Sequence, residues 1–451
     1  MGSTEEGIGQ LYGRTRYVIL LLSLLCLTFA FSNSLVFTFT VICMEDVIPA
    51  NSTDHWLQSP NKVHSLFSAI AIGCLIGTIP VSYSVQKWGI GKTSSIYCIF
   101  SAISTFCFPL AVHVGYPAVF AARVLQGIPT SLSFPALGQI ASQWATDKGL
   151  GSFMSILSIY MQLCSIFTMP ITSAFCTSDY GWRAAYYVHG VVSMFIFLCM
   201  FFFYDDNPAK HRTVSERELQ RISRGKTNQT KSKVVPYRAM LTDPSVYTIL
   251  ISLLGSTSGY QVFMLYGPTY LNKVLGLDVR ATGWGTALPF VFSAVMKFCL
   301  GPISDKASFV SPRTRLIFFT VLSQGLLSVC FLTMGTTSSQ LLAQIAYTGA
   351  IVASGIIAVG TFRGASMVYR QYVHFVMSIA SFLLVLIVFV LPQAVAFFCP
   401  DNTPQEWSRL FIFFSIFIVV LSTPYCFFAR ADPAVYTVKQ PLEQEKQSHL
   451  K

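Results

Sequence analysis

The chain has 451 residues, of which 53% are hydrophobic and 11% are charged, and its formal net charge is +11. This composition is too apolar and too poor in charge for an ordinary water-soluble globular protein. Apolar blocks of about 20 residues recur along nearly the whole chain, and each is long enough to cross a bilayer as a helix. We therefore expect an all-α integral membrane protein, because a transmembrane barrel would show alternating segments of about ten residues.

The positive charges concentrate in short loops and in the C-terminal tail. They form no basic stripe between aromatic side chains, so we expect the lipid bilayer and no nucleic acid as a partner. Their bias toward one set of loops predicts that both termini are cytosolic and that the number of spans is even. The first apolar run, from about Tyr17 to Met44, is too long for a cleaved signal peptide and is expected to remain as the first span.

In chain order, the sequence predicts two six-helix halves around a polar linker. The expected parts are a cytosolic N-terminus at 1–16, a first half at 17–204, a cytosolic linker at 205–243, a second half at 244–428 and a cytosolic tail at 429–451. The twelve predicted helices are 17–44, 63–85, 93–113, 117–142, 150–175, 184–204, 244–272, 282–303, 315–335, 338–362, 372–398 and 408–428. In the linker, Ser215 and Glu218 have the spacing of a capping box that starts a short surface helix.

Two features are expected on the side opposite the cytosol. The loop from Glu45 to Lys62 contains Asn51 in the acceptor triplet Asn-Ser-Thr, which predicts a glycosylation site. Cys176 and Cys399 lie in loops on that side, and whether they pair is left open. The other cysteines lie mostly within spans, where a thiol packs as a small hydrophobic group, and no zinc-ligand spacing occurs.

The stretch RVLQGIPTSLSFPALGQIASQW, Arg123 to Trp144, covers most of the fourth predicted span and places Arg123 about two turns inside its start. An arginine near the hydrocarbon costs roughly 2.5 to 3.5 kcal/mol on insertion scales, so it usually faces a bundle interior or a watery cavity. Two interpretations stay open: Arg123 attracts an anionic substrate, or it extends to the membrane surface as an anchor. Gly127 and the small residues after it offer a face on which a neighbouring helix can pack closely.

The stretch GPISDK, Gly301 to Lys306, matches the G-x-x-x-D-[RK] signature of the major facilitator superfamily after the eighth predicted helix. There Gly301 permits close helix approach, and Asp305, followed by Lys306, can accept hydrogen bonds at a neighbouring helix end, which predicts a conformational latch. The related stretch after the second helix, SYSVQKWGIGK, has Gln86 in place of the acid.

A closer resemblance is to the anion:cation symporter family, which includes sialin, the vesicular glutamate transporters and the type I sodium-phosphate cotransporters. The stretches that carry it are RVLQGI, FPALGQIASQWA, GWRAAYYVHG, DDNPAKHRTVSERELQRI, VPYRAMLTDPSVYTI, YGPTYLNKVLGL, WGTALPF, GPISDK and DNTPQEWSRLFIF. The resemblance implies the twelve-helix facilitator fold and anion transport. It also marks a divergent member, because Thr130 stands where the family has a coupling glutamate, and Ser34 and Ser256 stand where some members have arginines.

We expect a secondary transporter that works by alternating access. Its expected substrate is either a small organic anion that bears a carboxylate or inorganic phosphate. The candidate substrate-binding residues are Arg123, Thr130, Ser34, Ser256 and Tyr260, in a cavity formed by helices 1, 4, 7 and 10. The missing glutamate argues against a proton route and leaves sodium symport, membrane-potential drive or facilitated diffusion.

Catalytic residues, a metal site and a cofactor are not expected, apart from a coupling cation, Na⁺ or H⁺. His64, His189 and His374 are interpreted as packing residues. Lys297 is interpreted as extending to the membrane surface or as paired with Asp305.

The alternative function is a transport-inactive membrane scaffold or receptor-like relative. We expect a monomer in the plasma membrane or in a vesicular or lysosomal membrane.

Overall fold

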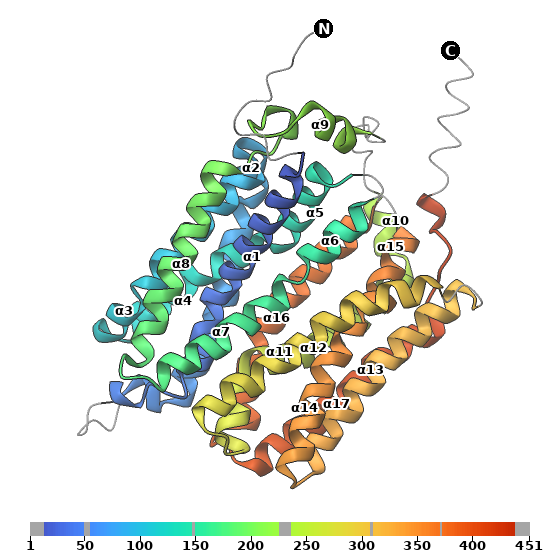
Figure 1. The fold of residues 1–451 in the computed structure, drawn as a ribbon. Coiled ribbons are helices and arrows are strands. Elements are labelled where there is room, and N and C mark those ends of the chain that lie inside the picture. Colours follow the sequence, from blue (N-terminus) through green and yellow to red (C-terminus); the bar gives the residue numbers. More distant parts are fainter. Residues whose placement is uncertain are drawn as a thin grey trace, which may run out of the picture. The chain divides into compact units, whose positions relative to one another are not determined.

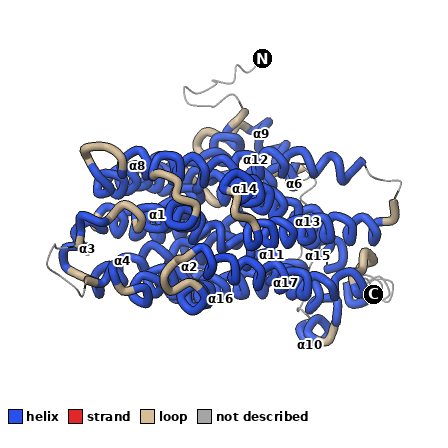
Figure 2. Tube along the Cα trace, turned by 90° about the horizontal axis from the view of Figure 1, so that it is seen from below, coloured by secondary structure: helices blue, strands red, loops and turns tan. Residues whose placement is uncertain are grey.

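A computed structural model describes residues 13–48, 55–146, 149–224, 236–306, 310–369 and 372–437. Helices joined by short connections make up this part of the chain, and it contains no strand (Figures 1 and 2). The chain divides into two compact units, residues 1–231 and 232–451, and the boundary falls inside the predicted linker.

Unit 1 is a bundle in which α1 packs against α7 and α8, while α2 packs against α4 and α8. Its helices are α1 (Thr15–Thr40), α2 (Pro60–Phe106), α3 (Phe108–Val114), α4 (Tyr116–Gly127), α5 (Ser133–Trp144), α6 (Leu150–Leu157), α7 (Tyr160–Cys176), α8 (Gly181–Phe203) and α9 (Glu216–Ser223). Its core joins apolar side chains of α1, α5 and α8, such as Ile19, Trp144 and Phe197.

Unit 2 is a second bundle in which α13 packs against α14 and α17, while α11 packs against α16 and α17. Its helices are α10 (Tyr237–Leu241), α11 (Pro244–Thr269), α12 (Val279–Lys306), α13 (Pro312–Thr336), α14 (Gln340–Ile356), α15 (Arg363–Tyr369), α16 (Val373–Phe398) and α17 (Pro404–Phe428). Its core includes Ile249, Tyr369 and Tyr425.

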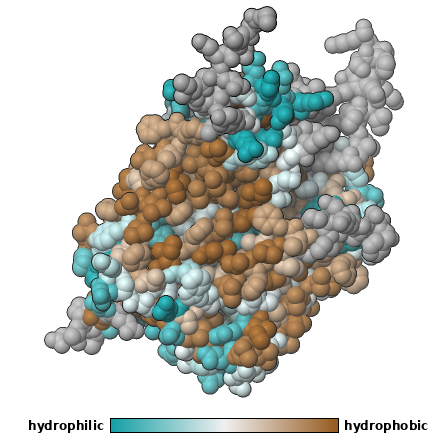
Figure 3. Space-filling model, in the orientation of Figure 1, coloured by the Kyte–Doolittle hydropathy of each residue, from teal (hydrophilic) through white to brown (hydrophobic). Residues whose placement is uncertain are grey.

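Among the described residues, nine helical stretches are long and apolar enough to cross a membrane, and a bent pair, Tyr83–Phe106 with Phe108–Val114, makes up to ten. The other two predicted spans are helical but fail that test. One is divided into α4 and α5, and the other, α12, has an apolar run interrupted by Lys297. In Figure 3, hydrophobic side chains gather over the flanks of α1, α7 and α8, and hydrophilic ones gather over α9.

The fourth predicted helix differs from the continuous helix expected at 117–142. A 3-10 segment, Ile128–Leu132, separates α4 from α5. Pro129 has no N–H to donate to an α-helical carbonyl, and the hydroxyls of Thr130 and Ser131 donate to the carbonyls of Gly127 and Ile128 at 2.6 and 2.8 Å. These bonds satisfy carbonyls that a broken helix would leave without donors.

The second and third predicted helices meet at a sharp bend around Gly89, whose φ of 83° lies in the left-handed region that favours glycine. Asp206, just after α8, accepts hydrogen bonds from the N–H groups of Ile90 and Gly91 at 3.0 and 3.3 Å. Its carboxylate therefore caps the start of the helix after the bend. Burial raises the pKa of Asp206, although these two hydrogen bonds oppose the rise.

The segment after α8 folds back onto the start of α1. Ser215 caps α9 by accepting from the N–H of Glu218 at 3.3 Å, which confirms the predicted helix start. The buried carboxylate of Glu218 accepts hydrogen bonds from the N–H groups of Thr15 and Arg16 at 3.2 and 2.9 Å. One acidic residue thus fixes α9 against the first turn of α1 and favours that turn through the helix dipole.

A disulfide links Cys43, after α1, to Cys176, at the end of α7, with Cα atoms 6.0 Å apart. The possible pairing of Cys176 with Cys399 is therefore wrong, and Cys399 is a free, buried thiol in unit 2. Sequence position alone did not indicate the partner, because it is the packing of α1 against α7 that brings the two chain segments together. Nearby, Arg183 and Asp46 form a salt bridge at 2.8 Å.

Candidate anion-binding site

Glycines set the distance between α2 and α4. A Cβ built on Gly127 would lie 2.2 Å from the carbonyl oxygen of Ile70, and one built on Gly73 would lie 1.9 Å from that of Val124. No larger side chain fits at either position without movement, so the backbones of the two helices are in contact. The expectation that Gly127 permits close packing is confirmed. The same close contact places Arg123 of α4 within hydrogen-bonding distance of the α2 backbone.

Arg123 is fully buried inside unit 1. Its Nη1 donates to the carbonyl oxygen of Ser34 and to Oε1 of Gln126, both at 2.8 Å, and its Nε donates to the carbonyl oxygen of Leu66 at 3.3 Å. Three groups from α1, α2 and α4 thus hold the guanidinium. An arginine with no exposed surface does not snorkel, so within unit 1 the geometry disagrees with the anchor interpretation.

Aromatic rings form one wall of this site. The Cζ atom of Arg123 lies 4.8 Å from the ring centroid of Phe37, which is a cation–π distance. Phe37 contacts the ring of Phe108, which stacks on Tyr186 with centroids 4.3 Å apart. The hydroxyl of Tyr186 shares a hydrogen bond with Thr40 at 2.9 Å. The wall excludes water and strengthens any electrostatic contact that the guanidinium makes.

No carboxylate in the described part of the chain forms an ion pair with Arg123. Its second terminal nitrogen, Nη2, has no hydrogen-bond partner there either. A buried guanidinium is normally paired with an anion, because an unpaired buried charge is costly. The site therefore has unused capacity for a negatively charged acceptor, and a carboxylate or phosphate fits the planar geometry of a guanidinium.

Gln126 orients Arg123 and was not singled out from the sequence. Its Oε1 accepts from Arg123 while its Nε2 donates to Oγ1 of Thr105 at 3.1 Å. The signal was present in the sequence, because residues three apart lie on the same helix face. Asn33 is another buried polar residue of unit 1. Its Nδ2 donates to the hydroxyls of Ser101 and Ser193 at 3.4 and 3.2 Å, and its Oδ1 is buried without a partner among the described residues.

The other predicted substrate-binding residues are only partly gathered around Arg123. Ser34 contributes its carbonyl oxygen, while its hydroxyl donates to Phe31. The Thr130 hydroxyl is used within its own 3-10 segment. Ser256 and Tyr260 lie in unit 2 on α11, where the Ser256 hydroxyl donates to backbone carbonyls of its own helix and the Tyr260 ring contacts Phe290. That all five share one cavity stays a prediction.

Several further expectations fall on residues whose side chains are not described. Gly301, Asp305 and Lys306 belong to α12, but their side chains lie outside the described set, as does that of His374. Asn51 also lies outside the described residues. The latch, the pairing of Lys297 with Asp305 and the glycosylation site therefore remain predictions. Of the histidines in unit 1, His189 is buried and lies 2.8 Å from the carbonyl oxygen of Ala185, as expected for a packing residue.

Two bundles of helices that are long and apolar enough to span a membrane define a multi-pass membrane protein. One bundle encloses a guanidinium that pairs with no carboxylate in the described part of the chain. The Major Facilitator Superfamily model matches residues 20–392, and the chain belongs to that family.

Comparisons with individual proteins agree with this assignment. The chain is 24% identical over 392 residues to sodium-dependent phosphate transport protein 1 of Oryctolagus cuniculus, a match covering 85% of this chain and 83% of the relative. It is 23% identical over 380 residues to sialin of Homo sapiens, covering 80% and 74%. The resemblance to the anion:cation symporters is confirmed at this level of identity.

The fold also resembles solved structures. The crystal structure of a bacterial homologue of the human lysosomal transporter Spinster, in an inward-facing and unoccupied conformation, matches with a TM-score of 0.70 and 14% identity. The match covers 92% of this chain and 97% of that chain. At this identity the likeness concerns the fold alone, and it supports the facilitator fold predicted from the sequence.

Proposed function

We propose that this transporter works by alternating access of its two halves and moves either a small organic anion that bears a carboxylate or inorganic phosphate across its membrane. The observation that carries the proposal is the buried guanidinium of Arg123, which lacks a carboxylate partner in the described part of the chain and has an unused Nη2. The names of two relatives, a phosphate transport protein and sialin, agree with an anionic substrate.

In the proposed mechanism, the substrate anion supplies the acceptor that Arg123 lacks. Gln126 and the carbonyl oxygen of Ser34 hold one edge of the guanidinium, which leaves Nη2 to meet the anion. The neighbouring aromatic rings lower the local polarity, so this charge-assisted contact is stronger than it would be in water. Because Arg123 has no exposed surface in this conformation, binding requires a conformation in which the site opens, as alternating access provides.

The proposed coupling follows from Thr130. Because a threonine at this position cannot carry a proton at physiological pH, we propose that uptake depends weakly on a proton gradient. Sodium symport, membrane-potential drive or facilitated diffusion would then supply the driving force. The protein would act as a monomer in the plasma membrane or in a vesicular or lysosomal membrane.

The competing function is a transport-inactive scaffold, and one observation favours it. Three of the donor positions of Arg123 are already used by groups of the protein itself, which is what a structural arginine would show. Against it stands the cost of keeping a cation in a span without a counter-ion, because an apolar residue would pack there at lower cost. We propose transport, and no enzymatic activity.

The test is uptake into proteoliposomes that contain the purified chain. Labelled monocarboxylates, dicarboxylates and inorganic phosphate are offered while a sodium gradient, a pH gradient and a membrane potential are imposed one at a time. The proposal expects saturable uptake of at least one of these anions with little response to the pH gradient. If no anion exceeds the protein-free level, the scaffold is supported. If acid drives accumulation, the weak coupling is wrong and the proton carrier must be sought among the histidines in or beside spans.

A further inference from the structure

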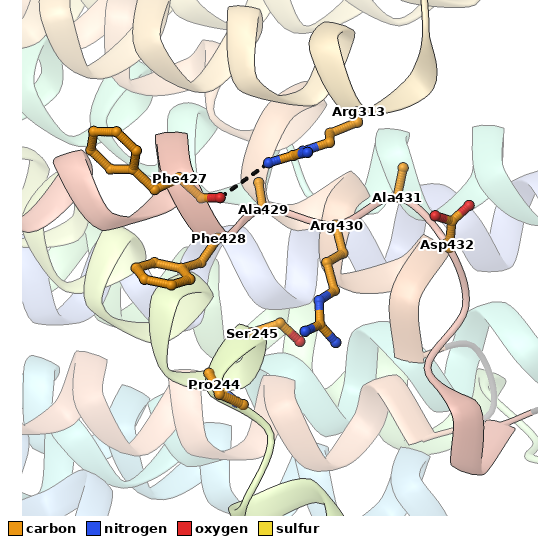
Figure 4. Close-up of a pocket in the computed structure, with 9 residues that line it drawn as sticks. All are labelled: Pro244, Ser245, Arg313, Phe427, Phe428, Ala429, Arg430, Ala431 and Asp432. Atoms are coloured by element: carbon orange, nitrogen blue, oxygen red, sulfur yellow. Dashed lines mark hydrogen bonds between the residues drawn. The ribbon is translucent and has the colours of Figure 1, made fainter.

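A pocket of about 310 Å³ lies in unit 2, where α11 and α13 begin and α17 ends (Figure 4). Its lining includes Ser245 from the first turn of α11, Arg313 from the first turn of α13, and Phe427, Phe428, Arg430 and Asp432 from the end of α17 and the segment after it. None of these residues belongs to the candidate anion-binding site, which lies in unit 1.

Two guanidinium groups face this pocket from different elements. Arg313 donates from Nη2 to the carbonyl oxygen of Phe427 at 3.0 Å and so ties the start of α13 to the end of α17. Arg430 is exposed and forms no salt bridge or hydrogen bond with any described residue. In Figure 4 it extends toward Ser245, while the carboxylate of Asp432 points away from it. The pocket therefore presents a guanidinium whose donors are unused.

No described acidic group forms a salt bridge with either arginine. Asp243, which caps α11, accepts hydrogen bonds from the N–H and the hydroxyl of Ser245 at 2.9 and 2.8 Å and from Tyr436 at 3.1 Å. The Asp243 carboxylate therefore already accepts the hydrogen bond of the first backbone N–H of α11, which is no longer available to an anion. An anion in the pocket would be held by the two arginines and not by the helix end.

The apolar part of the lining faces outward. Phe427 and Phe428 are 69% and 57% exposed, and they stand at the end of a helix that is long and apolar enough to span a membrane. Apolar rings exposed at the end of such a span lie beside the lipid, close to the edge of the hydrocarbon core. Exposed apolar rings beside two guanidinium groups, one of which makes no hydrogen bond with a described residue, favour an amphipathic ligand with an anionic head and apolar chains.

We propose that this pocket binds the phosphate-bearing head group of an anionic phospholipid, with Arg313 and Arg430 contacting the head group and Phe427 and Phe428 contacting the start of its acyl chains. The volume suits a head group and not a whole lipid. The charge bias of the loops places this end of the span in the cytosolic leaflet, which carries most of the anionic lipid. Inorganic phosphate shares the head-group chemistry, but it would leave the two rings unused.

The test is lipid binding to the full chain in detergent, followed by native mass spectrometry. Phosphatidylserine and phosphatidylcholine with the same acyl chains are titrated against wild type, Arg430→Gln, Arg430→Lys and Arg313→Gln. The matched control is Arg409→Gln, an exposed arginine in the second turn of the same helix, near its opposite end. Wild type should prefer phosphatidylserine. Arg430→Gln should weaken that binding about fivefold, since one basic residue at a membrane surface contributes on this order.

Arg430→Lys should keep most of the preference, and Arg409→Gln all of it. Equal binding of both lipids, or equal losses in Arg430→Gln and Arg409→Gln, would overturn the proposal. Inorganic phosphate is added at millimolar concentration as a competitor. If it displaces phosphatidylserine from wild type, the pocket is a site for soluble phosphate and the lipid is the wrong ligand.

Discussion

Arg123 carries its charge at a position with no exposed surface, and its stability there depends on a few named groups. Two backbone carbonyls, one amide oxygen and the face of Phe37 replace the water that the guanidinium has lost. The carbonyl of Leu66 is within reach only because Gly73 and Gly127 let α2 and α4 touch. The close packing of α2 against α4 at these two glycines therefore helps to stabilise the buried charge of Arg123.

Gly127→Ala should destabilise the protein, because the added Cβ would lie 2.2 Å from the carbonyl oxygen of Ile70 and would push α4 away from α2. Overpacking of this kind costs about 1 to 3 kcal/mol. The matched control is Gly138→Ala on α5, where a built Cβ meets nothing within 4 Å. Thermal unfolding of both variants in detergent gives the comparison. Equal midpoints for the two variants would show that the helices adjust freely and that the contact does not fix Arg123.

Elements were easier to predict than the contacts that join them. Hydrophobic blocks of span length located the helices, and the capping pattern located α9, because both signals are local. The break at Pro129 and the bend at Gly89 depend on side chains that compensate for lost backbone hydrogen bonds, so only the structure shows them. The sequence likewise shows that Gln86 replaces an acidic residue after the second predicted helix. It does not show that Asp206 caps the helix start nearby, because that contact joins residues more than a hundred positions apart.

Asp206→Ala should destabilise the bend, because it leaves the N–H groups of Ile90 and Gly91 without their acceptor. Loss of such a cap costs about 0.5 to 2 kcal/mol. Asp206→Asn keeps one oxygen in place and should cost less. The unfolding midpoints of the three proteins at one pH check this ranking, and a midpoint for Asp206→Ala equal to that of wild type would contradict the capping role.

The same residue gives a pH dependence with a definite sign. Burial and the charge of Asp205 raise the pKa of Asp206 in the folded protein, while the hydrogen bonds to Ile90 and Gly91 and the charge of Lys92 oppose the rise. Between the ordinary and the raised pKa, the folded state binds more protons than the unfolded state, so this group's contribution to stability falls as pH rises. Asp206→Asn should remove that slope, and an unchanged slope would assign it to another group.

At the scale of the whole molecule, the strongest sequence signal is the distribution of charge, which predicts the orientation in the membrane. The structure adds an independent observation, which is the disulfide between Cys43, after α1, and Cys176, at the end of α7. Disulfides persist on the oxidising side of a membrane. The bond and the charge bias therefore support the same prediction, that this end faces away from the cytosol.

Expression in a eukaryotic cell tests this orientation. A glycosidase should increase the electrophoretic mobility of the wild-type chain, and Asn51→Gln should abolish the shift. Asn228→Gln should change nothing, because its acceptor triplet lies in the predicted cytosolic linker. A glycan at Asn228 would reverse the orientation and would also place the Arg430 pocket in the wrong leaflet.

The most direct test of the central claim is anion uptake by Arg123 variants, normalised to the amount of protein delivered to the membrane. Arg123→Lys keeps the charge but loses the planar pair of donors, and should weaken transport of a carboxylate or phosphate. Arg123→Gln removes a charge-assisted contact of roughly 1.5 to 3 kcal/mol, which predicts about a tenfold to hundredfold weaker apparent affinity. Arg212→Gln, at an exposed position of unit 1, should leave uptake unchanged. Unchanged uptake in Arg123→Gln, with normal delivery, would contradict the assignment of Arg123 to the substrate.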